Sequence, residues 1–143
     1  MSLKFFSLKK FPLQRITNMP PKKLLSIGQC CADHSSISRL LTQNFQIEII
    51  NADNSKEAES LISAGTFSLI LVNRIFDTNG ESGLAFIEKY CSQQTSTSTP
   101  IMLVSNFDDA QKDAVSHGAI LGFGKNALTS SDTMLKLKNL LTD

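Results

Sequence analysis

Short apolar runs alternate with longer segments of helical periodicity from Lys23 to the end of the chain. Apolar runs of this length, bounded by polar residues or glycine, are typical of buried strands. They predict strands at residues 23–27, 46–50, 67–72, 100–105 and 119–123. The segments between them place apolar residues three and four positions apart, which is typical of amphipathic helices. They predict helices at residues 33–45, 54–65, 83–91, 108–118 and 130–141.

Capping residues and apolar stripes refine two of these helices. Asp33 and Ser35 are favoured N-cap types, so the first helix is expected to begin at one of them. In the third helix, Leu84, Ile87 and Cys91 are expected on one stripe, with Phe86 and Tyr90 beside it.

Five consecutive βα units predict a three-layer, doubly wound α/β fold of the flavodoxin-like (βα)5 type, with one parallel sheet between two layers of helices. The run at 67–72 is apolar on both faces, as a central parallel strand requires, whereas 46–50 alternates and is expected at an edge. In such folds, ligands bind beyond the carboxyl ends of the strands. The sequence contains neither GxGxxG nor a P-loop, so no nucleotide cofactor is expected.

Length and charge divide the 143 residues into a basic extension and one domain. We assign residues 1–21 to a basic N-terminal extension or linker and 22–143 to the domain. Residues 1–23 carry six basic and no acidic side chains, which leaves eight basic and thirteen acidic residues in 24–143, a balance of −5. This balance argues against nucleic-acid binding by the domain. No apolar run exceeds the four residues found at 69–72, which is too short to span a membrane.

The basic N-terminal segment has several interpretations, which the sequence leaves open. It lacks the apolar core of a secretory signal. Phe5, Leu8 and Phe11 have a helical spacing that would suit a membrane-surface anchor, but Pro12 would end such a helix. Otherwise the segment is a linker or arm, or extra sequence ahead of a natural start at Met19.

The cysteine and histidine residues do not form a recognisable metal or disulfide motif. Cys30, Cys31 and Cys91 are an odd number without paired spacing, which favours a reducing cytoplasm. His34 and His117 have no cysteine or carboxylate at ligand spacing, so no metal site is expected. Cys30 and Cys31 precede a predicted helix, whose N-terminus can lower a thiol pKa, and a redox sensor is one alternative function.

Polar or small residues follow four of the five predicted strands. Gly28 and Gln29 follow the first strand, Asn73 the third, Ser105 the fourth and Lys125 the fifth. Over residues 22–142 this arrangement resembles the receiver (CheY-like) domain of two-component response regulators. The stretches "PIMLVS", "SGLAFIEKY" and "GAILGFGK" resemble that family's fourth strand, the helix after its phosphorylation loop, and its lysine-containing segment. The resemblance implies that Gly28 and Gln29 stand at an acidic pair and Asn73 at the phosphoacceptor aspartate.

The departures from the family pattern remove its chemistry. An amide at Asn73 cannot attack phosphorus as a carboxylate does, because its nitrogen lone pair is delocalised. Mg²⁺ needs anionic oxygen ligands, and neither Gly28 nor Gln29 supplies one. The sequence therefore predicts a degenerate phosphorylation pocket with no metal. The family's switch aromatic corresponds to Gly122, and Phe123 beside it is expected in the core.

Three hypotheses describe the contents of this pocket. Lys125 could donate hydrogen bonds to the amide oxygens of Asn73 and Gln29, with Ser105 nearby. Lys125 could instead attract an anion. The third hypothesis is that these are ordinary polar residues at a wet strand edge. Asp33 is expected to lie outside the pocket as a helix cap.

The leading functional hypothesis is a cytoplasmic, non-enzymatic pseudo-receiver that signals by binding a protein partner such as a kinase, a regulator or an output domain. The resemblance implies a binding face at about 107–142, built from the fourth helix, fifth strand and fifth helix, which could also form a homodimer. One alternative is a phospho-accepting regulator that uses an atypical acid such as Asp77. Another is a small flavodoxin-like binding protein for an anion or an oxidant.

Overall fold

The computed structural model describes residues 20–93 and 99–142. Expectations about the basic N-terminal segment before residue 20 lie outside these residues, as does most of the polar connector at 92–99. Within the described residues, no helix is long and apolar enough to cross a membrane.

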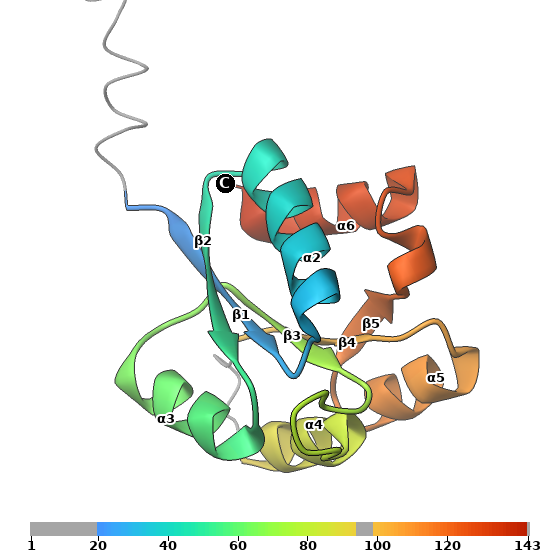
Figure 1. Cartoon of the computed structure of the whole chain (residues 1–143). Helices are drawn as coiled ribbons and strands as arrows, with labels where there is room; N and C mark the ends of the chain where they lie inside the picture. Colours follow the sequence, from blue (N-terminus) through green and yellow to red (C-terminus); the bar gives the residue numbers. More distant parts are fainter. Residues whose placement is uncertain (1–19, 94–98, 143) are drawn as a thin grey trace, which may run out of the picture.

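Five parallel strands form one sheet in the order β2-β1-β3-β4-β5, with helices on both faces (Figure 1). In chain order the elements are β1 (Lys22–Ile27), α2 (Cys31–Asn44), β2 (Ile47–Ala52), α3 (Ser55–Ala64), β3 (Leu69–Asn73), α4 (Gly83–Ser92), β4 (Ile101–Val104), α5 (Asp108–Ser116), β5 (Ile120–Phe123), the short 3₁₀ helix η2 (Lys125–Ala127) and α6 (Ser131–Leu141). The predicted doubly wound (βα)5 fold is confirmed, and β2 lies at an edge as expected.

Two hydrophobic cores lie on opposite faces of the sheet, because successive strand residues point to opposite sides. Leu24 of β1 and Leu71 of β3 pack on the side of α2 and α6, together with Ile37. Leu25 and Ile70 pack on the other side, which α3, α4 and α5 cover (Figure 1). The three inner strands β1, β3 and β4 are therefore largely buried on both faces, as their continuous apolar sequences predict.

The start of α2 differs from the prediction. The N-cap is Cys30, whose Sγ accepts a hydrogen bond from the backbone N–H of Asp33 at 3.4 Å, and the helix begins at Cys31. The expected cap at Asp33 or Ser35 is wrong. A thiol is a weak acceptor and is absent from the usual list of capping side chains, so sequence rules did not select it. The earlier start leaves the Asp33 carboxylate free for another contact.

The buried face of α4 contains Ile87 of the predicted stripe and the two aromatic residues beside that stripe. Phe86, Ile87 and Tyr90 are buried, whereas Leu84 and Cys91 are only partly buried. The rings of Phe86 and Tyr90 are stacked at 6.4 Å between centroids. The larger aromatic side chains therefore take the core position, and the aliphatic stripe lies to one side.

Candidate functional site

The carboxyl ends of β3, β4 and β5 surround a small cavity of about 220 Å³. Its walls are Asn73, Arg74, Ile75, Val104, Ser105, Asn106, Phe107 and Lys125. Three of the five predicted pocket residues, Asn73, Ser105 and Lys125, therefore line one cavity. Gly28 and Gln29 are not among its lining residues.

The side chain of Asn73 is fully engaged by the backbone around it. Its Nδ2 donates to the carbonyl oxygens of Gly28 at 3.0 Å and Ile75 at 2.8 Å. Its Oδ1 accepts from the backbone N–H of Arg74 at 3.0 Å. The amide thus joins the end of β1 to the loop that follows β3. A carboxylate could not reproduce these contacts, since it has no hydrogen to donate to either carbonyl oxygen.

Gly28 occupies a backbone conformation and a space that exclude a side chain. Its φ is +77°, in the left-handed region that favours glycine. A Cβ built on Gly28 would overlap the ring of Phe76, lying 2.7 Å from its Cγ. Phe76 is 1% exposed and packs against Phe86 with 6.4 Å between ring centroids. An aromatic core side chain therefore fills the space beside Gly28, which is one of the five predicted pocket residues.

The loop between β3 and α4 is held in place from two sides. The Asp77 N–H donates to the carbonyl oxygen of Gly28 at 3.0 Å. The Glu81 carboxylate accepts from the backbone N–H and the hydroxyl of Ser55, at 3.0 and 2.7 Å. The hydroxyl of Ser55 is the main cause that lowers the pKa of Glu81 below its usual value. These contacts tie the loop to β1 and to the start of α3.

Gln29 is buried, with 5% of its surface exposed. Neither of its side-chain polar atoms has a hydrogen-bond partner among the described residues. Burial of an unpaired amide is unfavourable, and ordered water commonly satisfies such groups. Gln29 carries no charge, so its burial adds no anionic ligand to this end of the sheet.

Ser105 is buried, and its hydroxyl serves the backbone. Its Oγ accepts from the N–H of Phe107 at 3.1 Å, which shapes the turn between β4 and α5. Its backbone N–H donates to the carbonyl oxygen of Phe123 at 3.0 Å, which ties this turn to β5. The hydroxyl therefore has a structural role at the cavity wall.

Lys125 forms an ion pair with Asp33 of α2. The hydrogen bond from Lys125 is the main cause that lowers the pKa of Asp33, and Cys30 contributes to the same shift. The hypothesis that Lys125 donates to the amide oxygens of Asn73 and Gln29 is wrong, because Asn73 Oδ1 accepts from Arg74 and Gln29 is unpaired. The sequence did not predict this contact of Asp33, because it placed the start of α2 two residues too late. With the helix starting at Cys31, the Asp33 side chain reaches Lys125 of η2 and does not cap its own helix.

Half-buried Arg74 and exposed Phe107 form a pair in the cavity wall that the sequence did not indicate. The Arg74 guanidinium carbon lies 4.8 Å from the centre of the Phe107 ring, which is the geometry of a cation–π contact. Phe107 is 59% exposed. Both residues also line an adjacent cavity of about 440 Å³ with Leu84 and Ala110. The only sequence signal was an aromatic residue directly after a strand-end serine and asparagine.

The remaining candidates do not join this cavity. Asp77 is exposed and does not line it. The three cysteines are free thiols, and burial raises the pKa of Cys91. Among the described residues, no group of three or more histidine, cysteine or carboxylate side chains could hold a metal ion.

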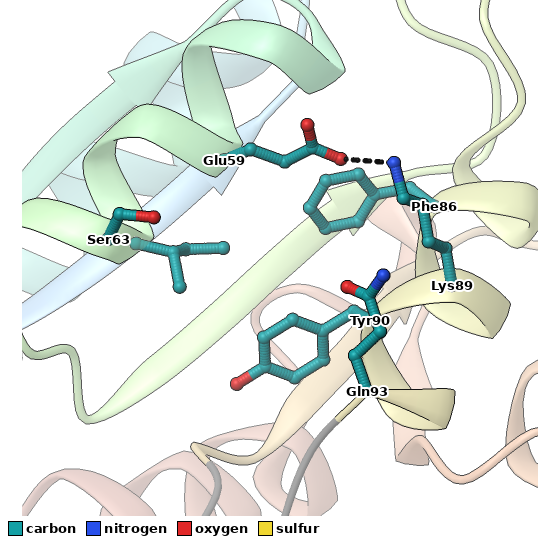
Figure 2. A pocket seen from close by; sticks show the side chains of 7 residues that line it. Glu59, Ser63, Phe86, Lys89, Tyr90 and Gln93 are labelled. Atoms are coloured by element: carbon teal, nitrogen blue, oxygen red, sulfur yellow. Dashed lines mark hydrogen bonds and ion pairs between the residues drawn. The ribbon is translucent and has the colours of Figure 1, made fainter.

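A separate pocket of about 340 Å³ lies between α3 and α4 (Figure 2). The buried rings of Phe86 and Tyr90 line it, and Lys89 and Glu59 form an ion pair at 3.0 Å across its edge. None of the predicted pocket residues contributes to it. The ion pair links α3 to α4 beside this pocket. We therefore interpret the pocket as a gap in the packing of the two helices.

Comparison with known proteins relates the fold to one group of solved structures. No family model matches the sequence, and no curated protein matches it. A response regulator from Burkholderia pseudomallei, solved with a phosphorylated aspartic acid and a calcium ion, is 24% identical with a TM-score of 0.65, over 85% of this chain and 67% of that one. A two-component response regulator from Clostridium difficile is 22% identical with a TM-score of 0.67, over 84% and 95% of the two chains. The chemotaxis protein CheY4 from Vibrio cholerae is 17% identical with a TM-score of 0.65, over 85% and 99%. At these identities the likeness establishes the fold.

Proposed function

Because the chain has the fold of response-regulator receiver domains, we propose that it is a cytoplasmic, receiver-like signalling module that works without phosphorylation and acts by binding a protein partner. The observation that carries the proposal is the engagement of Asn73 by two backbone carbonyl oxygens. On this proposal Asn73, which the resemblance implies at the phosphoacceptor position, is a structural amide. On this proposal the module is not an enzyme.

Two further features support a pocket without phosphoryl chemistry. The Phe76 ring blocks a side chain at position 28, so no carboxylate can stand there. Lys125 is already neutralised by Asp33, which weakens the attraction of this end of the sheet for an anion. The proposal therefore ranks above the alternatives of an atypical phosphoacceptor at Asp77 and an anion sensor.

Incubation with acetyl phosphate and Mg²⁺ tests the proposal. We expect intact-protein mass spectrometry to show no mass increase of one phosphoryl group, because no carboxylate is placed with a metal site to attack phosphorus. The Burkholderia pseudomallei protein, whose structure contains a phosphorylated aspartate, serves as the positive control under the same conditions. A hydroxylamine-sensitive adduct on this chain would refute the proposal, and mapping it to Asp33 or Asp77 would establish an atypical acceptor.

The partner-binding face that we propose is the edge of the sheet formed by α5, β5 and α6 (Figure 1). Leu121 of β5 and Leu135 of α6 are 56% and 59% exposed, and Val115 of α5 is also exposed. Single exposed apolar residues are ordinary, but apolar residues on three neighbouring elements are a feature of interaction surfaces.

Substitution on this face tests whether it supports a homodimer. We expect wild-type protein to self-associate in sedimentation velocity runs and Leu121→Asp to remain monomeric, because a buried unpaired carboxylate opposes association. Ile75→Asp is the matched control, since Ile75 is an exposed apolar residue outside this face. Equal loss of association in both variants would contradict the assignment. Wild-type protein that stays monomeric at every concentration would leave a different protein as the partner.

A further inference from the structure

The pairing of β4 and β5 contains an irregularity directly beneath the proposed partner face. Met102 pairs with Ile120 and Val104 with Phe123, so one residue of β4 lies opposite two residues of β5. This is a β-bulge, which leaves backbone groups without their regular ladder partners. At the bulge, a Cβ on Gly122 would overlap the carbonyl oxygen of Leu103, so the two backbones approach closely.

Gln111 of α5 inserts its amide into this bulge. Its Nε2 donates to the carbonyl oxygens of Leu103 at 2.9 Å and Ser105 at 3.1 Å, and reaches that of Phe123 at 3.4 Å. Its Oε1 accepts from the backbone N–H of Gly122 at 3.1 Å. The side chain is buried, with 8% of the residue exposed. One amide of α5 therefore binds backbone groups of both β4 and β5 and connects the three elements.

The bulge is also held from the opposite layer of helices. Lys136 of α6 donates from Nζ to the carbonyl oxygen of Gly122 at 3.0 Å. Gly122 is thus fixed through its N–H by α5 and through its carbonyl by α6. All three elements of the proposed partner face meet at this residue.

The same amide connects this face to the strand-end cavity. Gln111 donates to the carbonyl oxygen of Ser105, and the Ser105 hydroxyl accepts from the N–H of Phe107. Ser105 and Phe107 both line the cavity. An apolar side chain at position 111 would leave a buried N–H and buried carbonyl oxygens without partners, which is more unfavourable than the loss of exposed hydrogen bonds. The arrangement is therefore held by a group that neither titrates nor exchanges a ligand.

We propose that Gln111 is a positioning residue that holds α5, β5 and the Ser105–Phe107 turn in one conformation, so that the α5–β5–α6 face keeps a fixed shape whatever occupies the cavity. This inference goes beyond the proposed function, which concerns the chemistry of the cavity. Its test contains no phosphodonor, so the failure of one proposal is distinguishable from the failure of the other.

Amide hydrogen exchange of Gln111→Met, followed by NMR, tests the proposal. We expect exchange at Gly122 and Phe107 to accelerate by about tenfold or more relative to Leu71 in the central strand, because only the bulge loses its partners. Lys112→Met, at the exposed neighbouring position of the same helix, is the matched control and should leave exchange at Gly122 unchanged. Equal acceleration at Gly122 and Leu71, or no change at Gly122, would overturn the proposal.

A measurement on the wild-type protein covers the case in which the variant does not fold. We expect scalar couplings across the hydrogen bonds from Gln111 Nε2 to the carbonyl carbon of Leu103 and from Gly122 N to the side-chain carbonyl of Gln111. We also expect one set of resonances for β5. Missing couplings together with rapid exchange of the Gln111 side-chain protons would show that the amide is not the fixed connector, and would overturn the inference.

Discussion

Alanine at position 28 is expected to lower the free energy of unfolding by about 2–5 kcal/mol, from roughly 1–2 kcal/mol of left-handed backbone strain and roughly 1–3 kcal/mol of overpacking. The strain arises because Gly28 has a φ of +77°. The overpacking arises because the new methyl group would overlap the fully buried Phe76 ring. Urea denaturation followed by circular dichroism measures the change.

Gly80→Ala separates the two contributions. Gly80 has a nearly identical φ of +74°, but a Cβ there meets no atom within 4 Å. This variant should therefore show the backbone cost alone, about 1–2 kcal/mol. If Gly28→Ala costs no more than Gly80→Ala, the Phe76 ring does not block position 28, and that support for a pocket without a carboxylate is lost.

Asn73→Asp is expected to destabilise the domain by about 2–4 kcal/mol, since two carbonyl oxygens lose their donor and face a carboxylate. The change places an oxygen where Nδ2 now bridges Gly28 and Ile75. We also expect no phosphorylation by acetyl phosphate, because the single introduced acid has no acidic neighbours at Gly28 or Gln29. Chemical denaturation and intact mass measure the two outcomes.

Asn139→Asp is the control for the charge change, because Asn139 is exposed on α6. It should alter stability by only a few tenths of a kcal/mol. Unchanged stability in Asn73→Asp would show that the hydrogen bonds of Asn73 are not important to the fold. Stabilisation of this variant by Mg²⁺, together with acyl phosphate formation, would show a dormant phosphorylation site and contradict the proposed function.

The order of strands and helices was predictable because each buried strand corresponds to a short, mainly apolar run in the sequence. Residues 67–72 gave the central position of β3, and the alternation of 46–50 gave the edge position of β2, as the sheet order confirms. The strand ends follow from the same pattern. That is why Asn73, Ser105 and Lys125 could be expected together, and they line one cavity.

The contacts within the site were not predictable, because they depend on one-residue details of backbone geometry. The thiol cap at Cys30 moves the helix start and sends Asp33 toward Lys125, which no capping rule indicates. Phe76 packs beside Gly28 although the two residues are 48 positions apart in the chain. In the sequence, Phe76 is only an apolar residue in a loop. Likewise, Gln111 lies in a helix that looks polar, and only the bulge between β4 and β5 explains its burial.

The interlocking of Gly28 with Phe76 has a consequence for how this sequence can change over time. An acid at position 28 cannot be accommodated while the ring is present, and removal of the ring alone would open a cavity in the core, costing about 3–5 kcal/mol. Either single substitution is therefore expected to lower the stability of the domain. An acidic residue at position 28 therefore requires Gly28 and Phe76 to change together, so substitution of one residue at a time tends to preserve the present arrangement.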